Sequence, residues 1–286
     1  MIVKSNLELK GGNHAVLMLH GLSGSNLELA RIAQSLHARG FSVFAPNIEG
    51  YCFDTQTAPW QDWVEKAREH LERLLTRYET VSVLGLSMGA TLALALAEQE
   101  NIASMALLGT AMDYKGWAIP WYRFLLRLGR IFPGIDFTYK EEFPFGVKNP
   151  ELRAKMKQSF IKRRYAEAGG EEISLKHLIQ GDYLIEHVQK NLDAVSAPVL
   201  VIHAIEDETC SVRGAEKMFN QINSKHKEFI YLGDSYHLIT IDNQRQTVFN
   251  EVERFFCANI NASTHSDAFD LPKIYTKELK RIAARA

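Results

Sequence analysis

The stretch VSVLGLSMGATLALALAE, residues Val81–Glu98, decides the fold. It opens with the short apolar run Val81–Leu84, which is typical of a buried β-strand. It closes with a segment rich in alanine and leucine, which are strong helix formers. Between the two lies Gly85-Leu86-Ser87-Met88-Gly89, a G-x-S-x-G turn with a serine at its centre. The stretch therefore predicts a strand, a sharp turn that presents Ser87, and a helix.

The G-x-S-x-G spacing suits a serine that acts as a nucleophile. A tight turn projects the hydroxyl, so that a base and an acyl carbon can both reach it. Glycines two positions before and after the serine leave room where neighbouring chain passes close by. The helix directs its positive N-terminal end toward the site, which favours a developing oxyanion. The alternative interpretation is an ordinary glycine-containing turn. The nucleophile interpretation is favoured if the chain also supplies a base and an acid for Ser87.

Apolar runs and helix-periodic segments alternate on both sides of this stretch. The predicted strands are residues 3–10, 15–19, 41–45, 81–84, 104–110, 199–203 and 227–232. The predicted helices are residues 27–39, 60–78, 90–99, 212–222 and 243–260. Continuous apolar runs such as Ala15–Leu19 indicate strands that are buried on both faces. The alternation therefore predicts an α/β fold with a doubly wound, mostly parallel sheet.

This alternation stops between Met112 and Asp193, where no clear strand pattern is found. A structureless connection of that length is improbable in a compact domain. We therefore interpret the segment as an inserted helical cap. The expected domains are a core of residues 1–111 and 194–260, a cap of residues 112–193 and a C-terminal extension of residues 261–286.

The cap contains an amphipathic segment with two distinct faces. Trp121, Phe124, Leu125 and Leu128 repeat at helical spacing, and Arg123, Arg127 and Arg130 lie on another face. We expect Trp121 and Leu125 to bind substrate by roofing an acyl pocket, with the arginines toward solvent or a lipid surface. The alternative is that the apolar stripe only packs the cap onto the core.

The composition is that of an ordinary globular protein, with 46% hydrophobic residues, 23% charged residues and a net charge of −1. This balance does not favour nucleic acid. The three cysteines are too few for a disulfide framework, and without a C-x-x-C pair we predict no metal site. The N-terminus lacks a signal-peptide core, and Ala15–Leu19 is too short to span a bilayer. We therefore expect a cytoplasmic protein with no integral membrane segment.

A serine nucleophile needs a base near its hydroxyl and an acid that orients the base. In doubly wound sheets such groups gather at the carboxyl ends of the strands. The order along the chain that accompanies this turn is serine, acid, then histidine. Of the ten histidines, His237 alone follows the last predicted core strand in a loop before the closing helix. We therefore predict that His237 is the base, and we interpret His203, within an apolar strand, as a hydrogen-bonded core residue.

The acid should follow the strand at residues 199–203, and Asp207 is the predicted residue. Glu206 and Glu208 stay alternatives, because a sequence pattern places the end of a strand only to within a couple of residues. Asp234 lies close to His237 in sequence, but such a residue more often shapes a turn.

The oxyanion of an acyl-transfer intermediate needs backbone N–H donors. One donor should be the N–H of Met88, the residue after the nucleophile. The second should come from the loop His20-Gly21-Leu22-Ser23-Gly24, in which Leu22 is best placed. This chemistry implies no metal ion and no organic cofactor.

Four segments together carry a resemblance to a known family. They are HGLSG at 20–24, GLSMG at 85–89, EDETC at 206–210 and YHLITID at 236–242. The chain resembles the α/β-hydrolase carboxylesterases related to thermostable bacterial monoacylglycerol lipases, over about Ala15 to Phe256. It departs from that family at Tyr236, where a glycine usually precedes the histidine. The cap is also longer, and the tail beyond Asn259 has no counterpart.

This resemblance implies a catalytic triad of Ser87, Asp207 and His237, with Leu22 and Met88 as oxyanion donors. We expect a hydrolase of carboxylic esters with short-to-medium acyl chains, monoacylglycerols included, and transient contact with a lipid surface through the cap. A carbon–carbon bond hydrolase, a thioesterase or an aminopeptidase stays an alternative, because pocket and cap set the function of this scaffold. A non-catalytic small-molecule binding protein is an alternative of a different class.

Overall fold

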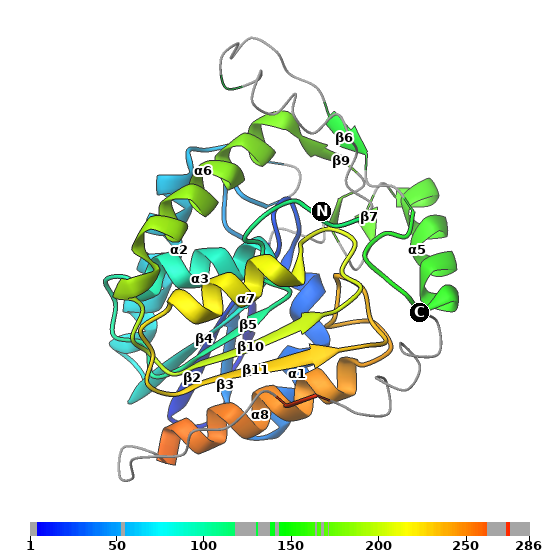
Figure 1. The fold of residues 1–286 in the computed structure, drawn as a ribbon. Helices are drawn as coiled ribbons and strands as arrows, with labels where there is room; N and C mark the ends of the chain where they lie inside the picture. The colour runs from blue at the N-terminus through cyan, green and yellow to red at the C-terminus, as the bar shows by residue number, and fades with distance from the viewer. Residues whose placement is uncertain are drawn as a thin grey trace.

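We describe the fold from a computed structural model of the chain (Figure 1). The described residues are 5–52, 55–117, 130, 138–140, 143–163, 165–166, 169–170, 172–261 and 273–274. Among them, no helix is both long enough and apolar enough to cross a bilayer.

The centre of the molecule is an eight-stranded sheet in the order β1-β3-β2-β4-β5-β10-β11-β12. Its strands are β1 (Leu7–Leu9), β2 (His14–Leu19), β3 (Ser42–Ala45), β4 (Thr80–Leu86), β5 (Met105–Leu108), β10 (Val199–Ala204), β11 (Lys227–Leu232) and β12 (Lys273–Ile274). Only β1 runs antiparallel to its neighbour, and the other pairs are parallel. The predicted doubly wound α/β fold is therefore confirmed. The short strand β12, which pairs with β11, was not expected from the sequence.

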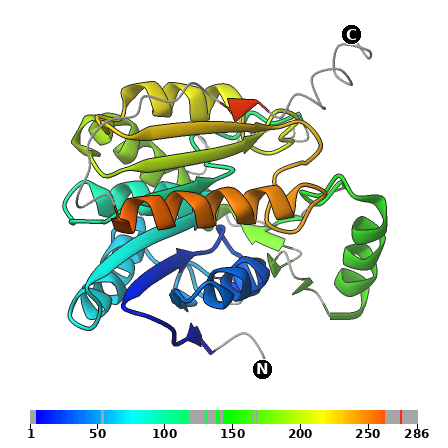
Figure 2. The same cartoon turned by 90° about the horizontal axis from the view of Figure 1, so that it is seen from below.

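Helices cover both faces of the sheet (Figures 1 and 2). On one face α1 (Ala30–Ala38) and α8 (Arg245–Asn261) pack against the sheet in one apolar core. On the other face α2 (Trp60–Leu75), α3 (Met88–Ala97) and α7 (Val212–Gln221) pack in a second core. Strands β2, β5 and β10 are buried along their whole length. Burial on both faces explains why these strands read as unbroken apolar runs rather than as alternating ones.

The insertion between β5 and β10 contains strands as well as helices. It holds α5 (Pro150–Arg163) and α6 (Leu175–Asn191), with a 3₁₀ turn at Leu192–Ala194. Two small antiparallel pairs join β6 (Thr138–Lys140) to β9 (Glu172–Ser174) and β7 (Tyr165–Ala166) to β8 (Gly169–Gly170). These strands have only two or three residues each, too few to show a recognisable alternation. The insertion predicted to be a helical cap therefore also contains short strands.

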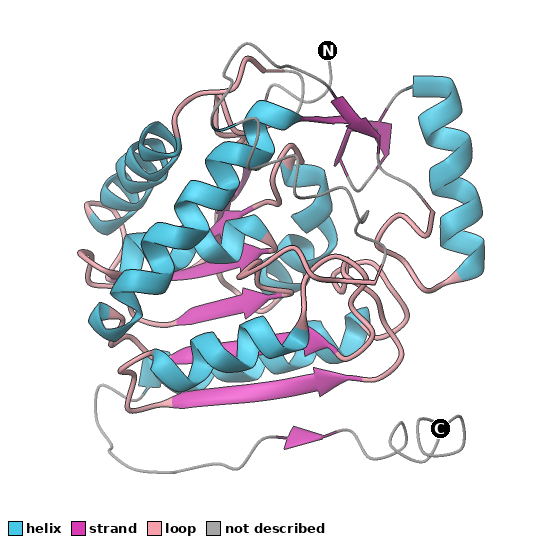
Figure 3. Ribbon diagram, turned by 45° about the horizontal axis from the view of Figure 1, so that its top comes forward, coloured by secondary structure: helices cyan, strands magenta, loops and turns pink. Residues whose placement is uncertain are grey.

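The two long helices of the insertion lie in different places. Helix α6 packs on α2 and α3, where Leu184, Ile185 and Val188 join the core of that face. Its first turn is capped by Ser174, whose hydroxyl accepts a hydrogen bond from the backbone N–H of His177. Helix α5 stands at the side of the molecule (Figure 3), and its Met156 contributes to the opposite core. The insertion thus reaches both faces of the sheet, and α6 lies on the helix that follows Ser87.

Candidate active site

The turn between β4 and α3 holds Ser87 in a strained conformation. Its φ of 56° and ψ of −120° lie outside the regions that residues with a Cβ ordinarily occupy. A Cβ on Gly85 would lie 2.3 Å from the carbonyl oxygen of Gly89. A Cβ on Gly89 would lie 2.1 Å from the carbonyl oxygen of Leu19. The two glycines are therefore required by the close approach of β2 and α3 around the serine.

Three side chains from separate strand ends form a continuous hydrogen-bonded relay. Nε2 of His237 lies 2.7 Å from Oγ of Ser87. Nδ1 of the same ring lies 2.8 Å from Oδ2 of Asp207. Because a carboxylate can only accept, Nδ1 carries the ring proton and Nε2 accepts from the serine hydroxyl. Both His237 and Asp207 are 6% exposed, so the relay is shielded from water apart from the half-buried serine.

The Asp207 carboxylate is surrounded by donors. Its Oδ1 accepts the backbone N–H groups of Thr209 at 2.9 Å and Cys210 at 2.7 Å. Burial by itself would raise the pKa of Asp207, but His237, His203 and the Cys210 N–H together hold that pKa below its ordinary value. The carboxylate therefore stays ionised beside His237 at neutral pH.

Glu208, the residue after Asp207, contacts the backbone of His237 rather than its ring. Its Oε2 accepts the backbone N–H of His237 at 3.0 Å, and only 3% of the residue is exposed. Burial and the neighbouring Asp207 charge raise the pKa of Glu208 to about 6. Of the three acidic residues in the turn after β10, Asp207 alone hydrogen-bonds the imidazole of His237 in the described part of the chain.

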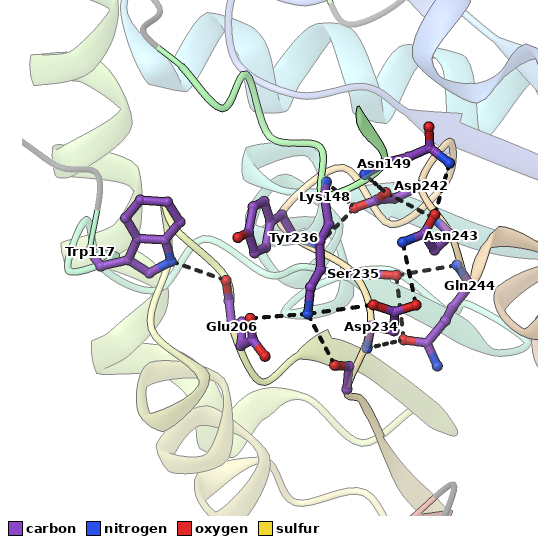
Figure 4. Close-up of polar contacts among 11 residues, drawn as sticks. Trp117, Lys148, Asn149, Glu206, Asp234, Ser235, Tyr236, Asp242, Asn243 and Gln244 are labelled. Atoms are coloured by element: carbon purple, nitrogen blue, oxygen red, sulfur yellow. Dashed lines mark hydrogen bonds and ion pairs between the residues drawn. The ribbon is translucent and has the colours of Figure 1, made fainter. Parts of the chain in front are cut away.

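The third of these residues, Glu206, belongs to an ion-pair cluster around Lys148 (Figure 4). Nζ of Lys148 lies 3.0 Å from Oε2 of Glu206 and 3.5 Å from Oδ1 of Asp234. It also lies 5.7 Å from the ring centre of Tyr236. Since Glu206 immediately precedes Asp207 and Asp234–Tyr236 precede His237, the ammonium group links the acid turn to the histidine loop. The side chain is only 17% exposed, which limits solvent screening of these pairs.

The buried carboxylate of Asp242 organises the histidine loop from the other side. It accepts the backbone N–H groups of Lys148 and Tyr236 through Oδ2, at 2.7 and 2.8 Å, and that of Asn149 through Oδ1, at 2.9 Å (Figure 4). The residue is 0% exposed. This carboxylate therefore ties residues 148–149 of the insertion to the chain on both sides of His237.

The two predicted oxyanion donors belong to segments that adjoin Ser87. Met88 follows it at the start of α3, and a Cβ on Gly21, the neighbour of Leu22, would lie 3.7 Å from Cβ of Ser87. The side chains of Leu22 and Met88 both approach Gly181 of α6. A Cβ on Gly181 of that helix would lie 3.2 Å from Cδ2 of Leu22 and 2.9 Å from Cε of Met88. The insertion therefore rests directly on both residues.

The predicted substrate-binding residues Trp121 and Leu125 lie outside the described residues, as do Arg123 and Arg127. Arg130 is described and pairs with Asp182 and Glu186 of α6. Its side chain is 20% exposed, so it is held in the protein rather than turned to solvent or lipid, contrary to the expectation for this face. Within the described part of the chain, no group of three or more histidine, cysteine, aspartate or glutamate side chains is arranged to hold a metal ion.

Sequence reasoning missed Lys148 and Asp242 and assigned His203 to the core alone. Lys148 lies in the insertion, about 60 residues before the acid turn, so no local pattern connects the two. Asp242 was available as a signal, because it closes the YHLITID segment that carries the resemblance. His203 is buried, as expected, but its Nε2 lies 3.3 Å from Oδ2 of Asp207.

Comparison with known proteins finds a family model and named relatives that match most of the chain. The model of the Hydrolase_4 family, described as serine aminopeptidase S33, matches residues 12–244. The chain is 27% identical over 251 residues to a carboxylesterase of Bacillus subtilis (strain 168), covering 86% of this chain and 93% of that protein. It is equally similar to a thermostable monoacylglycerol lipase of Bacillus sp. (strain H-257), of which 92% is covered.

The fold is shared with solved lipase structures. A monoacylglycerol lipase from Paleococcus ferrophilus superposes with a TM-score of 0.75 at 19% identity, covering 89% of this chain and 98% of that one. A monoglyceride lipase from Saccharomyces cerevisiae superposes with a TM-score of 0.74 at 16% identity, covering 92% of each chain. Because the family model spans most of the sequence, this chain belongs to the Hydrolase_4 family of α/β-hydrolases.

Proposed function

We propose that this chain is a serine hydrolase that cleaves carboxylic esters through an acyl-enzyme on Ser87. The observation that carries the proposal is the relay of contacts at 2.7 and 2.8 Å from Ser87 through His237 to Asp207. The names of the two Bacillus relatives, carboxylesterase and monoacylglycerol lipase, point to the same reaction. An intact relay at a strained serine also disfavours a binding protein without catalytic activity.

In the first half of the reaction, Oγ of Ser87 attacks the ester carbonyl while Nε2 of His237 takes its proton. The carbonyl oxygen becomes an oxyanion, which the backbone N–H groups of Leu22 and Met88 stabilise. Asp207 keeps the ring proton on Nδ1 and stabilises the imidazolium that forms. Its lowered pKa suits this role, because the carboxylate must be ionised throughout.

In the second half, His237 returns the proton to the leaving alcohol as the C–O bond of the tetrahedral intermediate breaks. Water then attacks the acyl-enzyme, His237 accepts a proton from that water, and the acid is released as Ser87 recovers its proton. None of these steps requires a metal ion or an organic cofactor.

The substrate class follows from the same proposal. We expect esters of short-to-medium acyl chains, monoacylglycerols included, with the acyl pocket beneath the insertion. The position of α6 over Leu22 and Met88 supports a roof at this place. We also expect the cap to contact a lipid surface. Arg130 does not take part in that contact, because it pairs with Asp182 and Glu186. The described cysteines are all free, which is compatible with the cytoplasmic location expected from the sequence.

Labelling and turnover with the purified protein test this proposal. A fluorophosphonate probe should label wild type and fail to label Ser87→Ala. Turnover should then be compared among p-nitrophenyl esters, a monoacylglycerol, acyl thioesters and aminoacyl p-nitroanilides. The last substrate matters because the family description names an aminopeptidase. Cleavage of the anilides without ester cleavage would overturn the assignment to esters, and absence of labelling would overturn the serine mechanism.

The pH dependence of kcat/KM provides a prediction for His237 and Glu208. The rate should rise between about pH 5 and 8, because only neutral imidazole can accept the Ser87 proton. Glu208, with its pKa raised to about 6, is anionic over most of that range and stabilises the protonated imidazole. Removal of this charge in Glu208→Gln makes the imidazolium less stable, so the rising limb should move to lower pH.

Profiles for wild type and Glu208→Gln, measured with one p-nitrophenyl ester, check this prediction. A wild-type profile that is flat from about pH 5 to 9 would argue against histidine base catalysis. A limb that moves to higher pH in Glu208→Gln would contradict the electrostatic role of Glu208.

Acyl-chain selectivity tests the predicted substrate-binding residues Trp121 and Leu125. In wild type each added methylene should improve kcat/KM by up to about fourfold, or about 0.8 kcal/mol, until the pocket is full. Trp121→Ala and Leu125→Ala should change the chain length at which this gain stops. Leu75→Ala is the control, because Leu75 is an exposed residue at the far end of α2. An acetate-only profile, or cap variants with the wild-type profile, would contradict the lipophilic pocket.

A further inference from the structure

His203 lies at the end of β10, four residues before Asp207, and none of its surface is exposed. Its Nε2 faces two oxygen atoms. It hydrogen-bonds the carbonyl oxygen of Cys210 at 3.3 Å, and Oδ2 of Asp207 also lies 3.3 Å away as an electrostatic contact. Oδ2 is the same atom that accepts the Nδ1–H of His237. The carboxylate of Asp207 thus lies between two imidazole rings.

The surroundings of His203 determine its protonation. Carbonyl and carboxylate oxygens only accept hydrogen bonds, so the ring proton must be on Nε2. Burial lowers the pKa of His203, which keeps the ring neutral. Nδ1 has no hydrogen-bond partner among the described residues, as expected for the bare nitrogen of this tautomer. His203 therefore presents an N–H dipole, and not a positive charge, to the carboxylate.

This dipole adds to the electrostatic stabilisation by the donors that already surround Asp207. Oδ1 accepts two backbone N–H groups, and Oδ2 accepts the ring of His237 with the His203 N–H beside it. One of the two donors to Oδ1 is the N–H of Cys210, and the carbonyl oxygen of the same residue accepts the Nε2–H of His203, so His203 also holds the turn that binds Oδ1. Rotation of the carboxyl group would break contacts at both oxygens.

We propose that His203 is a positioning residue: its Nε2–H holds the carbonyl of Cys210, and its N–H dipole, 3.3 Å from Oδ2, keeps the Asp207 carboxylate directed at Nδ1 of His237. The inference rests on the proposed function, since it acts only through Asp207 as the acid. A leucine in this apolar strand would avoid burying a polar ring with an unpartnered nitrogen. The imidazole of His203 therefore lowers the stability of the fold relative to leucine. We infer that it is present because its contact with the acid turn raises the catalytic rate.

A matched pair of substitutions separates positioning from packing. Glutamine carries an amide N–H₂ at about the distance of the imidazole Nε2, whereas leucine has a similar size without a donor. His203→Leu should lower kcat for p-nitrophenyl butyrate about tenfold with little change in KM, an effect within the range of coupled neighbours. His203→Gln should recover most of the lost rate. If His203→Leu does not fold, as judged by thermal unfolding, His203→Met takes its place.

A double-mutant cycle with Asp207 gives a readout that a packing defect does not produce. In the Asp207→Asn background, His203→Leu should cause no further loss of kcat, because the carboxylate that His203 positions is gone. His14→Leu is the control. His14 is also a buried histidine that bonds two hydroxyl groups, but it lies at the opposite end of the sheet. It should lose thermal stability and keep the wild-type kcat.

Three results would overturn the inference: wild-type kcat in His203→Leu, equal losses in the leucine and glutamine variants, or a full additional loss in the Asp207→Asn background. Failure of the proposed function looks different. In that case Asp207→Asn or Ser87→Ala itself keeps the wild-type rate. A large loss in both of these variants together with a normal rate in His203→Leu would refute the role of His203 alone.

Discussion

The Ser87→Ala variant should fold as wild type does and lose about 10⁴- to 10⁶-fold in kcat for ester hydrolysis, since members of a triad act as one unit. The hydroxyl is the atom that His237 contacts at 2.7 Å, and alanine leaves the base with nothing to activate. Alanine accepts the same positive φ about as poorly as serine does, so the strain at the turn is unchanged. Steady-state kinetics with a p-nitrophenyl ester measure the loss of kcat, and thermal unfolding shows whether the variant folds as wild type does.

A matched serine elsewhere in the sheet controls for this substitution. Ser82 lies on the same strand, is 0% exposed and bonds Ser104 and His14, far from the relay. Ser82→Ala should lose some stability, because it leaves buried partners unsatisfied, and keep its kcat. A folded Ser87→Ala protein that retains more than about a tenth of the wild-type rate would show that Ser87 is not the nucleophile.

The second large effect is expected for Asp207→Asn, which should lower kcat by about 10³- to 10⁴-fold. An asparagine amide can donate to Nδ1, and the ring then carries its proton on Nε2, facing the serine. In that tautomer His237 cannot take the Ser87 proton. The variant also removes the charge that stabilises the imidazolium. The KM should change little, because Asp207 is buried behind the histidine ring.

The neighbouring acidic residues are the controls for this assignment. Glu206→Gln removes an ion pair with Lys148, and Glu208→Gln keeps an amide oxygen that can still accept the His237 backbone N–H. Both variants should lose far less activity than Asp207→Asn, measured at the pH optimum of each protein. If either neighbour proves more damaging than Asp207→Asn, the role of the acid moves to that residue.

Local sequence was sufficient for the architecture of the core. The apolar runs at β2, β4, β5, β10 and β11 predicted strands, because burial on both faces of a parallel sheet leaves no room for polar alternation. The G-x-S-x-G turn predicted the strained serine, because its two glycines are needed wherever β2 and α3 crowd that turn. The order of residues along the chain then selected His237 and Asp207, whose side chains lie in contact at 2.8 Å.

The surroundings of the relay depend on contacts between segments that are far apart in sequence. Lys148 links the acid turn to the histidine loop because the insertion returns past both. Such contacts leave no local signature, because each partner taken alone is an ordinary surface charge or turn residue. The short strands of the insertion escaped prediction for another reason, since two or three residues carry no readable period.

His203 illustrates the difference between what local sequence predicts and what the folded structure adds. Its position within an apolar strand predicted that His203 is buried, and the structure confirms that the residue is buried. Its contact with Oδ2 of Asp207, four residues on, depends on the shape of the turn after β10, and the tertiary structure completes the group by bringing Nδ1 of His237 within 2.8 Å of the same oxygen. Hydrophobic pattern is a property of one segment and can be read from it, whereas the donor that faces a carboxylate depends on how several loops fold over one edge of the sheet.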